Sequence, residues 1–417
     1  MAAKLVWCFE AMNIVWVKAG GLLPVNSGGR SRSYHLLKYL AQRHSVSVFT
    51  FYPVQPNDPH PNLKELFSRF ECLPLELPVK GTLPDYFLYG RSLLAMRPYS
   101  LVKFHRRSLE ERVRSFCKQS CDVIVCDFLF SAPVIPWDIP CPKVLFSHNV
   151  EAAIWERHFR VANNPFWRAV CWREWWLIER AERMYARQAD AVWTVSDTDW
   201  KAFATFTNTE KISVIPTGVD TEYFHPAQGE EQSNCLVFTG SMDWLANEDA
   251  MIHFVKAILP LIRQQIPDVS LWIVGRAPTR QIQDLPSHHR NVYVTGTVND
   301  VRPYMKKAAV YIVPLRVGSG TRLKIFEAMA MAKAVVSTPT GAEGLPVTHG
   351  KDILLHASDE SFSEAVIGLL RDGDHRKRLG SAARKLVESG YSWTAATTIL
   401  EEALTRLVQK PGPWERS

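Results

Sequence analysis

Short runs of apolar and β-branched residues alternate along this chain with segments in which apolar residues recur at helical spacing. Each short run ends at a glycine, a proline or a polar loop. This alternation is typical of parallel α/β units, in which a helix returns the chain from one strand to the next. In the first half the pattern predicts strands at Asn13–Lys18, Ser45–Phe51, Val123–Cys126, Lys143–Phe146, Ala191–Val195 and Ile212–Ile215.

A polar segment, Thr217–Asn234, interrupts this alternation in the middle of the chain, and the same pattern then begins again. Two domains rather than one core are also what a length of 417 residues favours. We expect a first domain at residues 1–218, a second at 219–390, and a C-terminal helix at 391–417 that packs back on the first domain. The strands of the second half are expected at Cys235–Thr239, Ser270–Val274, Val292–Thr295, Val310–Val313, Ala334–Ser337 and Ile353–Leu355.

Glycines follow four consecutive expected strands of the second half. One glycine at a strand end is ordinary turn chemistry. Doubly wound parallel sheets bind ligands beyond the carboxyl ends of their strands, so four such loops predict one crevice lined by small residues and backbone N–H groups. The loops begin at Gly240-Ser241, Gly275-Arg276, Gly296-Thr297 and Gly318-Ser319.

The fourth loop lies within Pro314–Leu345 and combines glycines with charge. Gly318–Thr321 precedes an almost entirely apolar helix that nevertheless carries Arg322, Lys324 and Glu327. A helix N-terminus offers unpaired N–H groups and the positive end of the helix dipole, which both suit phosphate. Lys324 and Glu327 share a helix face, and burying them without partners is costly. The stretch therefore indicates a nucleotide or nucleotide sugar, while a surface ion pair behind a structural turn is the simpler alternative.

The composition indicates a globular protein, because 47% of residues are hydrophobic and 22% are charged. The formal charge of +7 is dispersed along the chain, which disfavours nucleic-acid binding. Eight cysteines without zinc-site spacing fit a reducing compartment. No apolar run reaches the roughly 18 residues of a membrane span. We expect a cytoplasmic location, with the inner face of the membrane as the alternative.

Eight segments together match the pattern of one known family. They are Thr217–Pro226, Phe238–Ala250, Trp272–Pro278, Val294–Val301, Pro314–Leu345, His148–Arg157, Val195–Trp200 and Tyr391–Trp393. In these segments the chain resembles the retaining glycosyltransferases often called group 1 or family 4. The resemblance implies the GT-B fold, an α/β architecture of two Rossmann-like doubly wound domains facing across a cleft. It also implies transfer of a sugar from a nucleotide-diphosphate donor on the second domain to an acceptor mainly on the first.

The resemblance assigns four residues to the catalytic site. Glu327 matches the second glutamate of the family's E-x7-E motif, which holds the ribose hydroxyls of the donor. Arg276 and Lys324 are the candidates for the diphosphate, where cations stabilise the charge that develops on the leaving group. His148 matches the family's first-domain histidine, which lies near the transferred sugar.

The other expected donor contacts come from small residues and loops. The resemblance implies that Gly28 and Gly29 approach the diphosphate and that the loop around Thr297 meets the base through its backbone. The complete expected binding set is Gly28, Gly29, Gly240, Ser241, Thr297, Val298, Gly318, Ser319, Gly320, Thr321 and Arg322.

Two departures from the family pattern concern the donor site. The first glutamate of E-x7-E falls on Ser319, and the usual Gly-Arg…Lys series becomes Gly240-Ser241…Ala246. We interpret both as relocation of charge, as in a subgroup that reads GSGTRLK. The resemblance favours front-face displacement without a protein nucleophile, in contrast to the paired carboxylates of glycoside hydrolases. We expect no metal and no cofactor, only a UDP- or GDP-sugar as co-substrate.

Two other functions remain open. A sugar-nucleotide epimerase of similar two-domain shape needs carboxylates beside the sugar, and Ser319 argues against it. A degenerate nucleotide-sugar-binding scaffold would bind the donor without transfer. The expected acceptor is a glycan or a lipid-linked glycoconjugate of the kind found in surface polysaccharides.

Several residues allow two interpretations. The aromatic and basic segment Phe166–Asp190 is either a helix whose tryptophans pack into the core, which we prefer, or a peripheral membrane or lipid-acceptor surface. Pro84–Arg107 is either a similar surface or a plain insertion. Glu151 either orients His148 or caps the next helix, and Asn247 is expected to be a helix cap.

Overall fold

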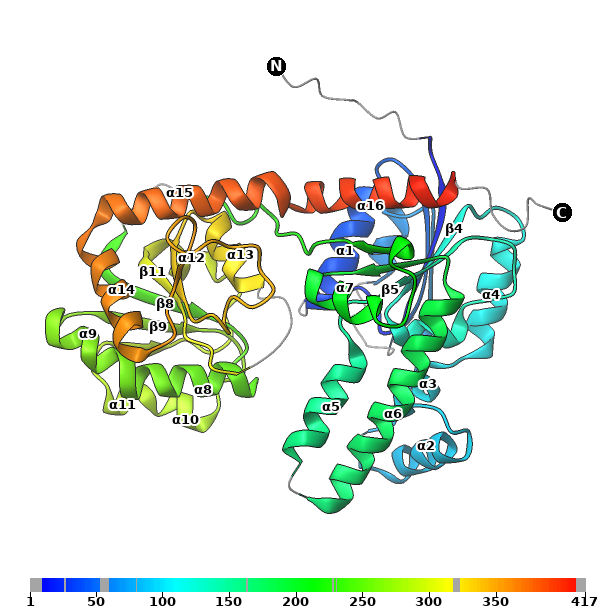
Figure 1. Ribbon diagram of the computed structural model, residues 1–417, viewed down its shortest axis with the longest axis horizontal. Coiled ribbons are helices and arrows are strands. Elements are labelled where there is room, and N and C mark those ends of the chain that lie inside the picture. The colour runs from blue at the N-terminus through cyan, green and yellow to red at the C-terminus, as the bar shows by residue number, and fades with distance from the viewer. Residues whose placement is uncertain are drawn as a thin grey trace. The chain divides into compact units, whose positions relative to one another are not determined.

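A computed structural model gives the structure of the protein as two compact units, Met1–Pro216 with Thr397–Ser417, and Thr217–Ala396 (Figure 1). Each unit is an α/β domain built around its own parallel sheet. The expected fold class, two Rossmann-like doubly wound domains, is confirmed. The structure describes residues 10–25, 28–52, 60–79, 81–162, 164–226, 229, 231–317 and 323–409.

The sheet of the first unit has seven described strands in the order β3-β2-β1-β4-β5-β6-β7, and all neighbouring strands are parallel. The order reverses between β1 and β4, and such a switch point is where open α/β sheets bind ligands. The strands are β1 (Asn13–Lys18), β2 (Ser45–Tyr52), β3 (Arg69–Pro74), β4 (Val123–Asp127), β5 (Lys143–Phe146), β6 (Ala191–Thr194) and β7 (Ile212–Val214).

The strand β3 is the one that the apolar pattern did not predict in this unit. It lies at the sheet edge and pairs only with β2. Its sequence RFECLP mixes charged residues with proline, and only Phe70 is buried. An edge strand needs few buried side chains and tolerates proline, so it gives no continuous apolar run.

Helices cover the sheet of the first unit and connect its strands. They are α1 (Gly28–Leu40), α2 (Leu83–Leu94), α3 (Tyr99–Phe104), α4 (Arg107–Cys117), α5 (Glu151–Val161), α6 (Pro165–Gln188), α7 (Asp197–Ala204), the short helical turns η1 (His60–Glu65), η2 (Leu129–Val134) and η3 (Thr209–Lys211), and the greater part of α16 (Trp393–Val408).

A buried carboxylate fastens α16 to the first unit. Glu401 is fully buried, and its Oε1 lies 3.0 Å from Nε of Arg43 and 3.2 Å from Nε2 of His44. Removing one partner of a buried ionic cluster leaves an uncompensated charge, which is strongly destabilising. This cluster therefore ties the C-terminal helix to the turn between α1 and β2.

The sheet of the second unit has six described strands in the order β10-β9-β8-β11-β12-β13, again all parallel. Its switch point lies between β8 and β11. The strands are β8 (Gln232–Thr239), β9 (Ser270–Val274), β10 (Val292–Val294), β11 (Ala308–Val313), β12 (Ala334–Ser337) and β13 (Leu354–Leu355). Every expected strand of both halves overlaps an observed one.

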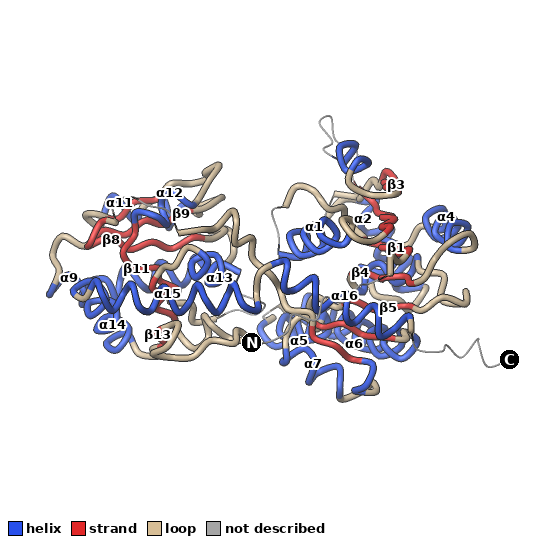
Figure 2. The backbone as a smooth tube through the Cα atoms, turned by 90° about the horizontal axis from the view of Figure 1, so that it is seen from above, coloured by secondary structure: helices blue, strands red, loops and turns tan. Residues whose placement is uncertain are grey.

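Helices lie on both sides of this second sheet, as Figure 2 shows. The buried core consists of the apolar faces of these helices against β8, β9, β11 and β12. The helices are α8 (Leu245–His253), the π-helical turn η4 (Phe254–Ile258), α9 (Leu259–Gln265), α10 (Arg280–Gln283), α11 (Leu285–His288), α12 (Arg302–Lys307), α13 (Leu323–Ala330), α14 (Asp359–Arg371) and α15 (Gly373–Gly390).

Two of the family-like segments contact each other at the border of the second unit. The backbone N–H of Val219 donates to the carbonyl of Tyr391 at 2.8 Å. A Cβ on Gly218 would lie 2.6 Å from the ring of Trp393, so only glycine fits there. The segments Thr217–Asp220 and Tyr391–Trp393 are therefore in direct contact, where the polar linker meets the start of α16.

Candidate functional site

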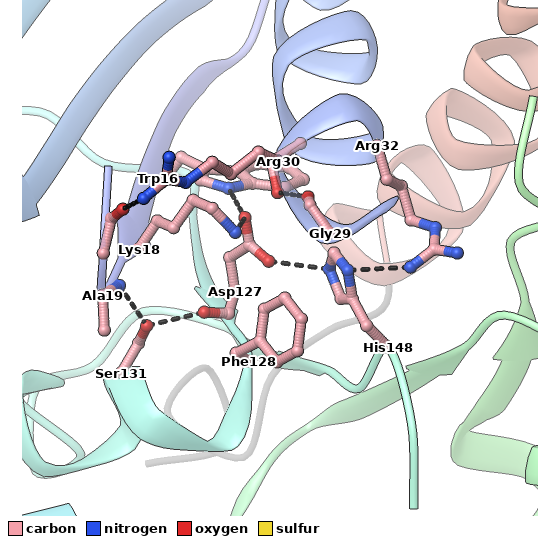
Figure 3. A network of polar contacts seen from close by, with 12 residues as sticks. Trp16, Lys18, Ala19, Gly29, Arg30, Arg32, Asp127, Phe128, Ser131 and His148 are labelled. Carbon is pink, nitrogen blue, oxygen red and sulfur yellow. Dashed lines mark hydrogen bonds and ion pairs between the residues drawn. The ribbon is translucent and has the colours of Figure 1, made fainter. Parts of the chain in front are cut away.

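The carboxyl edge of the first sheet holds a buried cluster of charged side chains (Figure 3). Lys18 ends β1 and Asp127 ends β4, and the two residues are partners across the switch point. Nζ of Lys18 lies 3.2 Å from Oδ2 of Asp127, and Nε1 of Trp16 donates to the same oxygen at 2.8 Å. Both charged side chains are buried. Such a pair is stable only because each charge satisfies the other.

His148 joins this cluster from the loop after β5. Its Nε2 lies 2.7 Å from Oδ1 of Asp127, and its Nδ1 lies 2.8 Å from Nη1 of Arg32 on α1 (Figure 3). A guanidinium can only donate, so Nδ1 is the acceptor and the ring proton resides on Nε2, beside the carboxylate. The ring also stacks on Phe128, with 4.0 Å between the centroids. The imidazole is therefore held from three sides.

Electrostatics keep this imidazole neutral. Burial lowers the pKa of His148 to about 3, although Asp127 partly opposes the shift. Burial also lowers the pKa of Arg32, to about 10. For Asp127, burial alone would raise the pKa, but the nearby Lys18 and His148 hold it below its ordinary value. Burial also lowers the pKa of Lys18, and its ion pair with Asp127 opposes the shift. At neutral pH the cluster thus combines a carboxylate, the cation of Arg32 and an uncharged histidine.

Gly29 provides the room for this arrangement. It lies in the first turn of α1, directly after the exposed Gly28. A Cβ at position 29 would lie 2.9 Å from the ring of Phe128 and 3.8 Å from Nδ1 of His148. Phe128 itself has a φ of +72°, which is strained for a residue with a side chain. The structure therefore brings together Gly29 and His148, two of the expected site residues.

The helix that follows His148 is capped by a residue from another helix. Glu182 on α6 accepts from the backbone N–H of Glu151 at 2.7 Å and from that of Ala152 at 3.3 Å. The side-chain oxygens of Glu182 thus satisfy two free N–H groups at the start of α5. Among the described contacts, the side chain of Glu151 accepts from Asn149, and none joins it to His148. Glu182, rather than Glu151, is therefore the cap.

Both carboxyls beside α5 have altered acidities. Burial raises the pKa of Glu182 to about 8, while its bonds from the two backbone N–H groups oppose the shift. Burial likewise raises the pKa of Glu151 to about 7. The start of α5 is consequently a region where protons bind near neutral pH.

In the second unit, the loops after β8 and β9 touch through two glycines. Gly275 has a φ of +150°, and a Cβ there would lie 1.7 Å from the carbonyl oxygen of Gly240. No other residue fits position 275 without moving the neighbouring loop. These glycines place the two strand ends side by side, as the strand-end pattern predicted.

Lys324 reaches this glycine edge from α13. Its Nζ donates to Oδ1 of Asn247 at 2.8 Å and lies 4.1 Å from the ring centroid of Phe238. A Cβ on Gly240 would lie 2.7 Å from the same Nζ. The amide of Asn247 also donates to the carbonyl of Ser241 at 2.8 Å. The expectation that Asn247 caps a helix is wrong, because it lies inside α8 and positions Lys324.

Arg276 belongs to the same edge. Its Nε donates to Oγ of Ser241 at 2.7 Å, and this hydroxyl in turn bonds to Asp243. The loops after β8 and β9 thus carry Arg276 and Ser241 in contact. Together with Lys324, they concentrate positive charge and hydrogen-bond donors where strands β8 and β9 end.

Glu327 lies one helical turn after Lys324 and is partly buried. Burial raises the pKa of its carboxyl to about 7, and the charge of Lys324 opposes the shift. The group therefore binds a proton more readily than an ordinary glutamate. Perturbed carboxyls of this kind occur preferentially at functional sites.

The remaining expected residues are less closely connected. Thr297 is exposed and Val298 packs against the core of the second unit. Among the described residues, no hydrogen bond or ion pair joins either one to Lys324 or Arg276. The expected Gly318, Ser319, Gly320, Thr321 and Arg322 lie outside the described residues. The described residues also contain no group of three or more His, Cys, Asp or Glu that could hold a metal ion.

Sequence reasoning missed most of the first-unit cluster. Lys18 and Asp127 are each the final, charged residue of an otherwise apolar run, NIVWVK and VIVCD. A charge at the carboxyl end of a buried parallel strand is the signal that points to them. Arg32 and Phe128 carry no such signal, because they meet His148 only in the folded chain.

Sequence models of two families match the chain. The model described as Glycosyltransferase Family 4 matches residues 27–223, and the one described as Glycosyl transferases group 1 matches residues 233–372. Together they include both described clusters except Trp16 and Lys18.

Curated relatives are similar over part of their length. The chain is 27% identical to the MMP alpha-(1->4)-mannosyltransferase of Mycolicibacterium hassiacum, over 60% of this chain and 64% of the relative. It is 28% identical to the GDP-mannose-dependent monoacylated alpha-(1-6)-phosphatidylinositol monomannoside mannosyltransferase of Corynebacterium glutamicum, over 47% of this chain and 55% of the relative. The chain thus spans less than two thirds of the relatives it matches.

Solved structures resemble the fold over nearly the whole chain. The HepE protein of Anabaena in complex with UDP and glucose has a TM-score of 0.64 at 15% identity, covering 94% of this chain and 99% of that one. A glycosyltransferase from Rickettsia africae has a TM-score of 0.67 at 13% identity, covering 97% and 100%. At such identities the likeness concerns the fold.

Proposed function

Because the chain belongs to the group 1 and family 4 glycosyltransferases, we propose that it transfers a sugar from a nucleotide-diphosphate donor to a hydroxyl of a glycan or lipid-linked acceptor. The observation that carries this proposal is the position of Lys324. Asn247 holds its ammonium group against Gly240, at the switch point of the second sheet. A cation there is suited to a diphosphate.

The donor binds to the second unit. Lys324 and Arg276 neutralise the diphosphate, and the backbone beside Gly240 and Gly275 lets it approach closely. Glu327 accepts hydrogen bonds from the ribose hydroxyls. UDP- and GDP-sugars are the donors to test first, since HepE is similar in fold and binds UDP, and a relative is named as GDP-mannose-dependent.

The transfer proceeds with retention and without a protein nucleophile. The acceptor oxygen forms its bond to the anomeric carbon on the face from which the diphosphate departs. The bond from that carbon to the diphosphate oxygen breaks, and the acceptor proton passes to the departing phosphate. The protein contributes position and the cations that stabilise the leaving group.

His148 serves in this scheme as a neutral group that fixes Arg32 and the loop after β5. Its low pKa and the short distances from its ring nitrogens to Asp127 and Arg32, 2.7 Å and 2.8 Å, support this role over that of an acid or base. The acceptor binds to the first unit, at the edge where this cluster lies.

A nucleotide screen followed by a transfer assay tests the function. Thermal-shift measurements with UDP, GDP, ADP, TDP and CMP identify the base, because a ligand stabilises the fold by mass action. The product of the cognate donor is then analysed by NMR, and its anomeric configuration should equal that of the donor.

Two substitutions sharpen the assay. Glu327→Ala should abolish most transfer while the fold is retained, and Glu364→Ala, an exposed helical glutamate, is the matched control. An epimerised donor without an acceptor would support the epimerase instead. Nucleotide binding without any turnover of the unmodified protein would support the degenerate scaffold.

A further inference from the structure

Four helices of the first unit form a lobe beside its sheet. Figure 1 shows α5 and α6 running side by side away from the strands, with α2 beside α6. Nη2 of Arg173 on α6 donates to the carbonyl of Ser92 on α2 at 2.7 Å. The N–H of Tyr99, at the start of α3, donates to Glu174 of α6 at 2.9 Å. We call α2, α3, α5 and α6 the helical lobe.

The outer surface of the helical lobe exposes large apolar side chains. In α2 the only buried residue is Ser92, whereas Leu83, Phe87 and Leu94 recur at helical spacing and are 84%, 72% and 89% exposed. A helix that served only to cover a core would turn this stripe inward. Apolar patches of this kind on a folded protein mark an interaction site.

The helix α6 continues the exposed surface. Trp172, Trp176, Arg180 and Met184 follow one another at four-residue spacing and are all exposed, on the side opposite the buried residues of this helix. Phe166 and Trp167 add to the surface at the start of α6. The preferred sequence interpretation, in which the tryptophans pack into the core, is therefore wrong for Trp167, Trp172 and Trp176.

The charge of the helical lobe is positive. Its four helices, residues 83–94, 99–104, 151–161 and 165–188, contain nine lysines and arginines against six aspartates and glutamates, an excess of +3. Three of the six acidic side chains, Glu151, Glu174 and Glu182, are buried. Arginines also lie against the aromatic rings, with Arg180 over Trp176 and Arg168 over Phe159.

We propose that the helical lobe binds the surface of an anionic lipid bilayer. Tryptophan, with an apolar body and a polar N–H, and arginine, with an apolar stem and a charged head, are both suited to the headgroup layer. Exposed leucine and phenylalanine supply the part that enters the acyl boundary. No helix of the described residues is long and apolar enough to cross a membrane, so this is contact with one face of the bilayer.

This surface lies at a defined place relative to the candidate site. The helix α5 begins three residues after His148 and has 11 residues. At 1.5 Å per residue, its far end is about 16 Å from its start. A bilayer bound at that end would keep a lipid-linked hydroxyl within reach of the first-unit cluster. The binding itself does not rest on the proposed transfer, because it needs neither donor nor acceptor.

Flotation of the full-length protein with lipid vesicles tests the proposal. The protein should float with vesicles of phosphatidylcholine mixed with phosphatidylglycerol, and less with phosphatidylcholine alone. Added salt should weaken the binding to the mixed vesicles, since the charge term is screened. Absence of flotation with anionic vesicles at low salt, for a folded protein, would overturn the proposal.

Substitutions separate the apolar contribution to membrane binding from the electrostatic one. Trp172→Ser with Trp176→Ser should lower the partition coefficient by about tenfold or more for mixed vesicles, because exposed apolar area no longer leaves water. Arg168→Gln with Arg180→Gln should lower it by about fivefold per arginine for mixed vesicles, with little change for neutral ones. Circular dichroism and thermal unfolding confirm that these surface variants remain folded.

Matched controls lie in the second unit. Tyr293→Ser removes an aromatic side chain of similar exposure, and Arg280→Gln removes an exposed arginine, so neither should alter flotation. An equal loss of flotation in the lobe variants and the control variants would contradict the proposal. Sedimentation of the protein without lipid is the last test, because an oligomer that dissociates in the tryptophan variant would assign the surface to a second copy and also contradict it.

Discussion

The imidazole of His148 and the carboxylate of Asp127 are 2.7 Å apart at the ends of neighbouring strands β5 and β4, both buried. Lys18 and Arg32 complete the cluster from β1 and α1. Side chains from four parts of the chain, β1, α1, β4 and the loop after β5, thus meet at the switch point of the first sheet. The arrangement has measurable consequences for stability, since its groups titrate differently in the folded and unfolded chain.

We expect His148 to make the folded protein acid-sensitive. Its pKa is about 3 in the folded state against an ordinary value of 6.5, so the unfolded chain binds the proton first as the pH falls. Stability is fully present above 6.5 and is lost as the pH falls toward 3. Between about pH 7.5 and about pH 4.5, His148 should lower the free energy of unfolding by roughly 2–3 kcal/mol.

Urea unfolding of the unmodified protein and of His148→Asn at both pH values measures this contribution. The asparagine cannot titrate, so the variant should lose less stability on acidification by that amount. The same loss in both proteins would show that the imidazole is not the group responsible.

We expect Gly29→Ala to disturb the first-unit cluster without unfolding the chain. The new methyl group would approach Phe128 to 2.9 Å, and the ring is stacked on His148. The rate of sugar transfer should fall by at least about tenfold, through a higher KM for the acceptor or a lower kcat. Small displacements of positioned groups are costly for the reaction. Nucleotide binding should weaken less than transfer, because Lys324 and Arg276, the proposed diphosphate cations, lie in the second unit.

Gly368→Ala is the matched control for this substitution. Gly368 lies in helix α14, and nothing lies within 4 Å of a Cβ there. The alanine should stabilise the protein by up to about 1 kcal/mol through its better helix propensity. A similar loss of activity in both variants would indicate a general sensitivity to alanine rather than a contact with Phe128.

We expect Lys324→Met to weaken nucleotide-diphosphate binding. The ammonium group held by Asn247 is the cation nearest Gly240, and a charged hydrogen bond contributes about 1.5–3 kcal/mol. Titration calorimetry should therefore give a dissociation constant larger by roughly 10- to 150-fold for the cognate diphosphate. The loss for the corresponding nucleoside should be smaller, and the exposed Lys307→Met should change neither.

The strand-end glycines show which features of the candidate site could be predicted from the sequence alone. Gly240 and Gly275 follow apolar runs, and their contact needs only the rule that parallel strands end at one edge. Lys324 and Glu327 were predicted as site residues because a charge on an apolar helix is conspicuous. These signals are local in sequence. The parallel sheet alone then brings the residues at neighbouring strand ends close together.

Other features depend on long-range packing and left no local signal. Arg32 is an ordinary basic residue of an amphipathic helix until α1 places it beside His148. Asn247 looked like a helix cap because its residue type favours caps. In the fold it lies inside α8, where Lys324 and the carbonyl of Ser241 use its amide instead.

The tryptophans of α6 illustrate the opposite error. Large aromatic residues are usually buried, so a helix rich in them was assigned to the core. The periodicity was present, since Trp172 and Trp176 are four residues apart, but it does not tell which side of the helix faces the protein. The buried Cys171, Leu177 and Ile178 decide that side in the structure.

We expect Glu182→Gln to change the pH dependence of stability in the sense opposite to His148. The pKa of Glu182 is about 8 in the folded state against 4.5 ordinarily, because of burial. The folded state therefore keeps this proton longer, and its stability falls as the pH rises from 4.5 toward 8. The glutamine does not titrate, so from about pH 5 to about pH 8 the free energy of unfolding of the variant should gain roughly 2–4 kcal/mol relative to the unmodified protein.

Urea unfolding across this range measures the difference, with the exposed Glu364→Gln as the control. A constant difference between variant and unmodified protein would mean that Glu182 stays ionised at the start of α5, where the two backbone N–H groups would then outweigh its burial.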